Sequence, residues 1–250
     1  MTNHNFSFRT DRYDFWSIYE AIKKYYPIGI SESLEESFPG RKEKEKLIVE
    51  NIHQPENYKS RWEDKISKWQ QELGLTIRST TYGQVPSLSA DVFLEEETYK
   101  DRILTKKIHI SVSLLGPFYT LFGLDQTDLV TQSHELNSNP RHYLATHRLV
   151  VSPEQEFKET YIKLRDMLES NFEGYRFVPF GIYSSTIEGL HLNFLHLGEP
   201  SCVYYALFDN MIDFSCPVYG DQFKYGYDQW NIENPNMDDH WTIYPPGYQP

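Results

Sequence analysis

A strict alternation of apolar and polar residues in the middle of the chain limits the possible folds more than any other pattern. The apolar positions of this stretch are Ile108, Ile110, Val112 and Leu114, and polar residues stand between them. Successive side chains of a β-strand point to opposite faces of a sheet, so this period predicts a strand with one buried face. Gly116 and Pro117 then predict a turn. Because Phe118 to Leu124 is again strand-like, we expect a β-hairpin over Ile103 to Leu124.

Strand-like patterns also occur on both sides of this hairpin. Before it, the apolar residues Leu88, Ala90, Val92 and Leu94 alternate with polar ones. After it, further strands are predicted at 143–151, 175–183, 190–197 and 202–209, with a hairpin loop at 198–201. The segment from Asp125 to Arg141 is polar and rich in Asn, Ser and Pro, which predicts a loop.

Helical periodicity is found in two regions. Near the N-terminus, apolar residues recur every three or four positions from Asp11 to Tyr26, and the charged segment from Arg41 to Gly74 predicts a helical hairpin or kinked arm that Pro55 must interrupt. In the middle of the chain, Ser152 is followed by Pro153 and, three positions after the serine, by Gln155. This order is typical of a helix N-terminus, so we predict one long helix over 153–172.

These elements predict an α+β fold, because antiparallel strands follow one another and helices gather at one end of the chain. We expect a mainly antiparallel sheet of about six to eight strands, an N-terminal helical segment and one long helix in the middle of the chain. Residues 1–250 are expected to form a single domain, since a chain of this length with 39% hydrophobic residues can build a large core. Its parts are a helical segment at 11–74, the sheet with its helix at 75–209, and an aromatic, acidic segment at 210–250 packed on the sheet.

The net charge of −12 excludes some classes of partner. Nucleic acids and anionic membranes both require a basic surface, so we expect neither as a partner. Only Cys202 and Cys216 are present, which is too few for a disulfide framework. The N-terminal residues contain no apolar run of the kind found in secretory signals, and no stretch is apolar enough to span a membrane. We therefore expect the cytoplasm as the location.

The last 42 residues, Asp209 to Pro250, combine acidic with aromatic side chains. Seven of these residues are acidic and one is a lysine, which accounts for half of the net charge of the chain, and nine are aromatic. Carboxylates pair with Lys and Arg, and Tyr and Trp supply rigid contact area, so the composition favours binding to a basic protein surface. The predicted contact residues are Asp228, Trp230, Glu233, Asp238, Asp239 and Trp241.

Histidines and cysteines give weak signals for chemistry. The paired histidines are His142 with His147 and His191 with His196. A spacing of five places two rings on opposite faces of a strand, so neither pair predicts a metal site. Cys202 and Cys216 lack the helix N-terminal or basic surroundings that activate a thiol, and Cys202 is expected in the core. We predict no cofactor and no metal.

Two groups of acidic residues could do chemistry. Asp238 and Asp239 precede His240, and a carboxylate beside an imidazole can serve as acid and base. Asp91 and the run from Glu95 to Glu97 could hydrolyse a glycoside if two of their carboxylates faced each other across a cleft. Sequence neighbours rarely converge on one substrate, and no nucleophile elbow, phosphate loop or dinucleotide fingerprint accompanies either group. We therefore assign no catalytic residue.

The sequence favours a protein-binding module that occludes or docks a basic protein partner. In its general character, acidic, α+β and without motifs, the chain is similar to the immunity proteins that neutralise bacterial toxins. Two alternatives stay open. One is a hydrolase that uses carboxylates with a histidine such as His240, and the other is a self-associating structural protein that uses the charged segment from Arg41 to Gly74.

Overall fold

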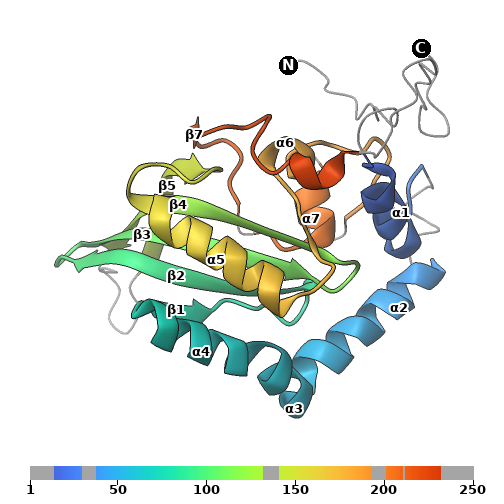
Figure 1. Cartoon of the computed structure of the whole chain (residues 1–250), viewed down its shortest axis with the longest axis horizontal. Helices are drawn as coiled ribbons and strands as arrows, with labels where there is room; N and C mark the ends of the chain where they lie inside the picture. The colour runs from blue at the N-terminus through green and yellow to red at the C-terminus, as the bar shows by residue number, and fades with distance from the viewer. Residues whose placement is uncertain (1–13, 30–37, 132–140, 193–200, 211, 232–250) are drawn as a thin grey trace.

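A computed structural model gives the arrangement of the chain and describes residues 14–29, 38–131, 141–192, 201–210 and 212–231. In this part, a curved sheet carries helices on both of its faces (Figure 1). The helices are α1 (Trp16–Tyr25), α2 (Pro39–Ile48), α3 (Pro55–Tyr58), α4 (Asp64–Leu73), α5 (Lys158–Asn171), α6 (Phe180–Tyr183) and α7 (Val203–Leu207). The predicted α+β fold, with N-terminal helices, a mainly antiparallel sheet and a long helix in the middle of the chain, is confirmed.

The sheet has seven strands within the described residues. They are β1 (Thr76–Ser79), β2 (Ser87–Thr98), β3 (Arg102–Ser113), β4 (Phe118–Thr131), β5 (Arg141–Val150), β6 (Arg176–Phe177) and β7 (Val218–Tyr219). Strands β1 to β5 lie in sequence order, and each pairs antiparallel with the next. The hairpin expected over Ile103 to Leu124 is formed by β3 and β4, with Ile110 opposite Leu121. The short strands β6 and β7 pair in parallel with β4 and β5.

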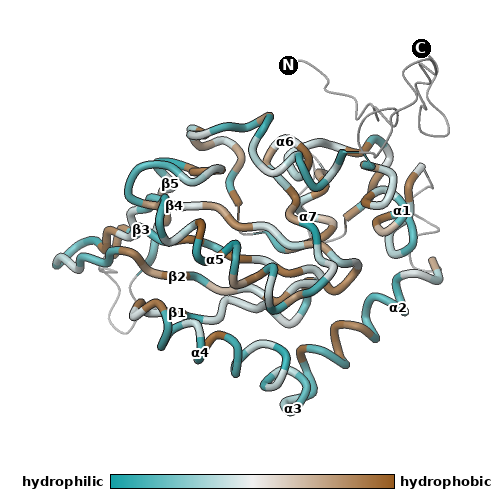
Figure 2. The backbone as a smooth tube through the Cα atoms, in the orientation of Figure 1, coloured by the Kyte–Doolittle hydropathy of each residue, from teal (hydrophilic) through white to brown (hydrophobic). Residues whose placement is uncertain are grey.

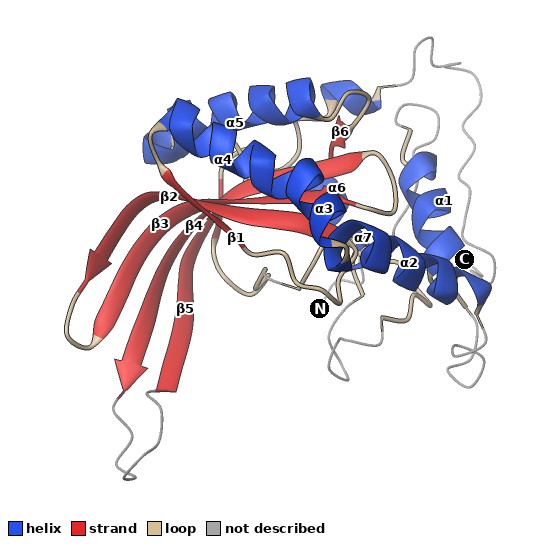
Figure 3. Cartoon of the chain, turned by 90° about the horizontal axis from the view of Figure 1, so that it is seen from below, coloured by secondary structure: helices blue, strands red, loops and turns tan. Residues whose placement is uncertain are grey.

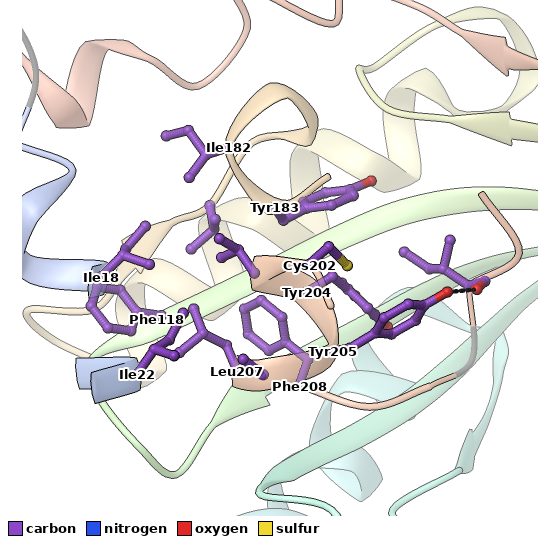
Figure 4. Close-up of a cluster of buried hydrophobic side chains, with 14 of the residues drawn as sticks. Ile18, Ile22, Phe118, Ile182, Tyr183, Cys202, Tyr204, Tyr205, Leu207 and Phe208 are labelled. Atoms are coloured by element: carbon purple, nitrogen blue, oxygen red, sulfur yellow. Dashed lines mark hydrogen bonds between the residues drawn. The ribbon is translucent and has the colours of Figure 1, made fainter. Parts of the chain in front are cut away.

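The alternation along the strands places a different hydrophobic core on each face of the sheet. One core joins the apolar residues of β2, β3 and β4 to α4 and α5, and it includes Trp62 and Phe157, neither of which is exposed. The other core lies on the opposite face, where Phe118 and Phe122 of β4 meet residues of α1, α6 and α7 (Figure 4). Because helices cover both faces here, the polar residues that alternate with the apolar ones are buried as well.

The helical segment before the sheet is a kinked arm, and its break lies at Pro55, as the sequence predicted. Helix α2 continues into a π-helical turn, η2 (Val49–His53), and the backbone is extended at Gln54 before α3 begins at Pro55. A second π-helical turn, η3 (Lys59–Glu63), joins α3 to α4. Proline lacks the N–H that an interior helical hydrogen bond needs, so it can begin a helix but not continue one.

Two segments predicted as strands, 175–183 and 202–209, each contain a short helix. Only Arg176–Phe177 of the first segment is a strand, and it is followed by α6. The second segment contains α7, in which every residue is buried. A short apolar run that is buried on all sides does not show whether its period is that of a strand or of a helix, which is why the prediction was wrong.

Residues 190–192, the described part of the strand predicted at 190–197, do not form a strand of the sheet. Leu190 makes an isolated antiparallel bridge to Ile28, next to the end of α1, and residues 193–197 lie outside the described residues. Cys202, which was expected in the second strand of a hairpin with 190–197, makes an isolated antiparallel bridge to Thr186 instead. The first bridge joins the segment after α6 to the end of α1, and the second joins two parts of that segment to each other.

The central helix begins later than its sequence signature predicts. A 3-10 turn, η4 (Gln155–Phe157), comes first, and α5 starts at Lys158. The hydroxyl of Ser152 does not cap the helix but accepts the backbone N–H of Asp221 at 2.8 Å. Gln155 has a positive φ of 48°, which a helix N-terminus does not allow. The Ser152 hydroxyl, which was expected to cap the helix, therefore binds the C-terminal segment instead.

Strands β4 and β5 are longer than predicted. The polar segment 125–141 is a loop by composition, yet β4 continues to Thr131 and β5 begins at Arg141, while residues 132–140 lie outside the described residues. As a result, β2 to β5 extend past the helices and curve away from them (Figure 3). We call residues 94–106, 125–131 and 141–148 the sheet extension. The tip of β2 and β3 within it is strongly hydrophilic (Figure 2).

Candidate functional site

A cluster of charged and polar side chains is buried between the sheet and α7. Asp91 on β2 is directly opposite His109 on β3, and Lys107 and Ser111 lie on the same face as His109 because they are two positions away from it. Asp209, which follows α7 along the chain, enters the cluster from the helical layer. Asp91, His109, Ser111 and Asp209 are each at most 3% exposed.

His109 lies at the centre of this cluster. Its Nδ1–H donates to Asp91 Oδ1 at 2.7 Å, and its Nε2 lies 3.0 Å from Ser111 Oγ and 3.2 Å from Asp209 Oδ2. The Ser111 hydroxyl donates to the same oxygen of Asp209 at 2.8 Å, and the Tyr204 hydroxyl donates to its other oxygen at 2.6 Å. Asp209 therefore ties the end of α7 to strand β3.

The carboxylates around His109 favour its charged form. Burial lowers the pKa of His109, but Asp209 and Asp91 together outweigh burial and raise this pKa to about 9. Burial raises the pKa of Asp91, whereas its bonds to His109 and Lys107 outweigh burial and lower it. The ammonium of Lys107 binds Asp91 Oδ2 at 2.7 Å, so two basic groups face two carboxyl groups. Such pairing is what makes the burial of charged groups tolerable.

Asp91, His109 and Ser111 are linked in the order carboxylate, imidazole, hydroxyl, as in a catalytic triad, but their protonation states differ from those of a triad. In a triad, a neutral imidazole takes the proton of the serine hydroxyl. Here the pKa of His109, about 9, leaves the imidazole protonated at neutral pH, and Ser111 donates its own proton to Asp209. Ser111 also has no exposed surface on which a substrate could bind. We therefore interpret the cluster as a structural connection between the sheet and α7.

Sequence reasoning missed this cluster, although part of its signal was present. The alternation that predicted β3 also placed Lys107, His109 and Ser111 together on one face. A polar face is normally exposed to water, so the pattern by itself indicates nothing unusual. Only the packing of α7 and Asp209 over that face makes the residues a buried cluster.

The six predicted contact residues have different positions. The side chain of Asp228 is 72% exposed, and its Oδ2 lies 4.0 Å from Arg165. Trp230 is fully buried instead, and its Nε1–H donates to the carbonyl of Phe177 at 2.6 Å. Its indole therefore belongs to the core, and the prediction that Trp230 contacts a partner is wrong. The remaining four residues, Glu233, Asp238, Asp239 and Trp241, lie outside the described residues, as does His240.

In the described part of the C-terminal segment, the exposed aromatic residues are Tyr219 and Phe223. Tyr219 belongs to β7, and its carbonyl accepts the N–H of Val151 at 3.0 Å. Asp221 then shapes a turn, because its Oδ1 accepts the backbone N–H groups of Phe223 at 3.1 Å and Lys224 at 2.9 Å. Phe223 is 74% exposed, the largest value for a large apolar residue in the described part. We call residues 219–224 the aromatic turn.

The acidic residues of β2 are engaged in separate contacts. Asp91 is part of the buried cluster. The other contacts are Glu95 with Lys106 at 2.7 Å, Glu96 with Arg78 at 2.8 and 3.0 Å, and Glu97 with the Tyr99 hydroxyl at 2.6 Å. The hydrogen bonds from Arg78 lower the pKa of Glu96, which makes it a poor proton donor. Glu95 and Glu97 line one pocket together with Asp125 and His147, but each of these two glutamates is already bound to another side chain.

The cysteines and the described histidines do not form a reactive centre. Burial raises the pKa of Cys202 to about 12 and also raises the pKa of Cys216, so both thiols stay protonated. His142 pairs with Asp128 at 2.8 Å, and His147 bonds the Thr127 hydroxyl at 2.7 Å. Among the described residues, no group of three His, Cys, Asp or Glu side chains could hold a metal ion.

The comparisons with known proteins found no relative of this chain. No family model matches the chain, and neither a curated protein nor a solved structure is significantly similar to it. Within the described ranges, no helix has the length and apolar character needed to cross a membrane. Any functional interpretation therefore has to come from the geometry and chemistry of the chain itself.

Proposed function

We propose that the protein binds a basic protein partner through the aromatic turn and nearby carboxylates, as an immunity-type inhibitor of a bacterial toxin would. The observation that carries this proposal is the 74% exposure of Phe223 on a turn whose backbone is held in place. A large apolar side chain that is exposed and already ordered is a typical interface anchor, because binding orders little further chain.

The aromatic turn is held from both of its ends. On one side, β7 pairs with β5, and the N–H of Asp221 donates to the hydroxyl of Ser152 at 2.8 Å. On the other side, Trp230 is buried in the core, and the side chain of Gln229 accepts the N–H of Phe177 at 2.7 Å. These contacts support a turn that keeps its shape before a partner arrives.

Charge supports a basic partner. The described segment 212–230 contains the exposed acids Asp213, Asp221 and Asp228 and a single basic residue, Lys224, and the whole chain carries −12. Opposite charges on a partner would speed association and make it sensitive to salt. In the proposed mechanism, the carboxylates pair with Lys or Arg residues that a toxin uses on its substrate, and Phe223 fills a neighbouring pocket. The protein would act in the cytoplasm.

Affinity capture with matched aromatic variants tests this proposal. The wild-type chain, Phe223→Ala and Tyr82→Ala are immobilised and exposed to lysate of the native host at low and moderate salt. Tyr82 is a suitable control because it is 55% exposed in a different part of the molecule. We expect one stoichiometric basic protein to bind the wild type and Tyr82→Ala and to be released by salt. Its affinity for Phe223→Ala should fall by about tenfold or more, as expected for an interface anchor.

Two results would contradict the proposal. Equal capture by Phe223→Ala and the wild type would exclude the aromatic turn from the interface. If the wild type captures no protein, the result would favour the hydrolase alternative. The buried cluster does not support that alternative, because His109 is 1% exposed and holds a proton, and His240 lies outside the described residues.

A further inference from the structure

The sheet extension has two open edges. On one side, β1 pairs with β2 only at residues 90–93, so among the described residues no strand lies beside β2 from residue 94 onward. On the other side, β7 pairs with β5 only at Leu149 and Val150, and no other strand of the described chain lies beside β5 on that side. Residues 95–98 and 141–145 are all exposed. The unpaired backbone groups of an open edge are a template for another strand.

The two open edges differ in charge. The edge of β2 carries three consecutive acids. Lys106 binds Glu95 and Arg78 binds Glu96, whereas no described basic residue pairs with Glu97. The edge of β5 carries Arg141, two histidines and no acid, while Arg148 on the same strand is already paired with Asp125 and Glu156. Like charges on facing strands are destabilising, whereas opposite charges are favourable. Pairing between two β2 edges or two β5 edges is therefore disfavoured, and pairing of β2 with β5 is favoured.

Apolar side chains accompany the charges on the β5 edge. Tyr143 is 53% exposed and Leu144 is 60% exposed, and as strand neighbours they point to opposite faces of the sheet. A strand placed beside β5 would cover part of both side chains. This burial would add to the backbone hydrogen bonds and the charge pairing along the same edge.

The strand directions also suit pairing between β2 and β5. Each strand from β2 to β5 is antiparallel to the next, so β2 and β5 run in opposite directions. A second copy in the same orientation would therefore place its β2 antiparallel to β5 of the first copy. The sheet would continue across the contact in its own antiparallel pattern.

We propose that this protein self-associates by pairing the β5 edge of one copy with the β2 edge of a second copy. The contact is heterologous, because it joins two different surfaces, and each added copy leaves one open edge of each kind. It involves neither the aromatic turn nor the charged arm before the sheet. Because opposite charges drive it, the association should weaken as salt increases.

A charge-swap experiment tests this contact directly. Glu97→Lys and Arg141→Glu are the variants of choice, since both side chains are exposed and, among the described residues, Glu97 bonds only Tyr99. Sedimentation velocity of the full chain should show association at high concentration and low salt. Each variant alone places like charges on the two edges and should weaken association by about tenfold or more. An equimolar mixture should restore it, because both mixed contacts again join opposite charges.

Glu72→Lys provides the matched control, because it makes the same charge change at an exposed position at the end of α4. This variant should associate like the wild type. A wild type that stays monomeric at every concentration would overturn the proposal, and so would single edge variants that associate normally. A mixture that fails to associate would also overturn it. Loss of association in Glu72→Lys would place the contact on the helical arm instead of the sheet extension.

Discussion

At the scale of single residues, the charge on His109 is the most consequential property of the described structure. The imidazole is 1% exposed, and its hydrogen bonds to Asp91 and Asp209 connect β2, β3 and the end of α7. A buried charge with well-placed partners is tolerated, but removal of one partner leaves the other uncompensated. The stability of the fold should therefore depend on whether His109 holds its proton.

The raised pKa of His109 predicts a loss of stability at alkaline pH. Its pKa in the folded protein is about 9, whereas a histidine in an unfolded chain has a pKa of about 6.5. The proton therefore stabilises the fold fully below about pH 6.5, and this contribution is lost as the pH rises through about 9. Urea unfolding over this range should show a fall of about 3 kcal/mol in the free energy of unfolding.

Two histidine variants separate this effect from general alkaline unfolding. His109→Gln should remove most of the pH dependence and should already be destabilised by about 3 to 5 kcal/mol near pH 6. His142→Gln should keep the wild-type dependence, because the side chain of His142 is 56% exposed and its pairing with Asp128 is at the surface. A wild-type unfolding free energy that stays constant over this range would contradict the interpretation of the cluster.

At the scale of secondary-structure elements, the close approach of the η4 turn to the sheet depends on a glycine in β4. The ring of Phe157 lies against Gly123, and a Cβ at position 123 would be 2.6 Å from Phe157 Cδ1. Phe157 has no exposed surface, so its ring cannot move into solvent. The absence of a side chain at Gly123 thus sets how closely the start of α5 can pack on β4.

Gly123→Ala should therefore destabilise the protein by overpacking. We expect a loss of about 1 to 3 kcal/mol in the free energy of unfolding, measured by chemical denaturation. Phe157→Leu should also be destabilising, but the double variant should lose less than the sum of the two, since the smaller side chain makes room for the new methyl group. Strictly additive losses would show that the two residues do not restrict each other.

At the scale of the whole molecule, Trp230 joins elements that are far apart in the sequence. Its carbonyl accepts the N–H of Asp14 at 2.8 Å, just before α1, and its ring lies 4.3 Å from the guanidinium of Arg176. Arg176 in turn donates to the carboxylate of Asp14 at 2.8 Å. The C-terminal segment, the first helix and β6 are therefore held together around one indole ring.

Replacement of this indole should affect stability, whereas replacement of Phe223 should not. Trp230→Ala should lower the free energy of unfolding by about 3 to 5 kcal/mol, as expected for a buried aromatic residue. Phe223→Ala should change it by less than about 0.5 kcal/mol, because its side chain is largely in solvent. Chemical denaturation of both variants measures the difference. Similar losses in the two variants would contradict the assignment of Trp230 to the core and of Phe223 to the surface.

Prediction succeeded where a sequence pattern corresponds to one local geometry. The alternations around Ala90 and Ile110 led to β2 and β3, and Pro55 was correctly placed at the break of the helical arm. It failed where tertiary contacts compete with local signals. The capping signature at Ser152 was present, but the hydroxyl binds Asp221 instead, and the apolar run before Asp209 became a buried helix.

The amino-acid sequence alone determined the fold class, the hairpin and the break in the helical arm, because periodicity and proline act over a few neighbouring residues. Only the tertiary structure decided which polar residues became buried and which aromatic residues remained exposed. His109 and Trp230 are buried, and Phe223 is exposed, because segments distant in the sequence pack over the first two and leave the third uncovered. Burial is a property of that packing, so a residue's own neighbours in the chain do not determine it.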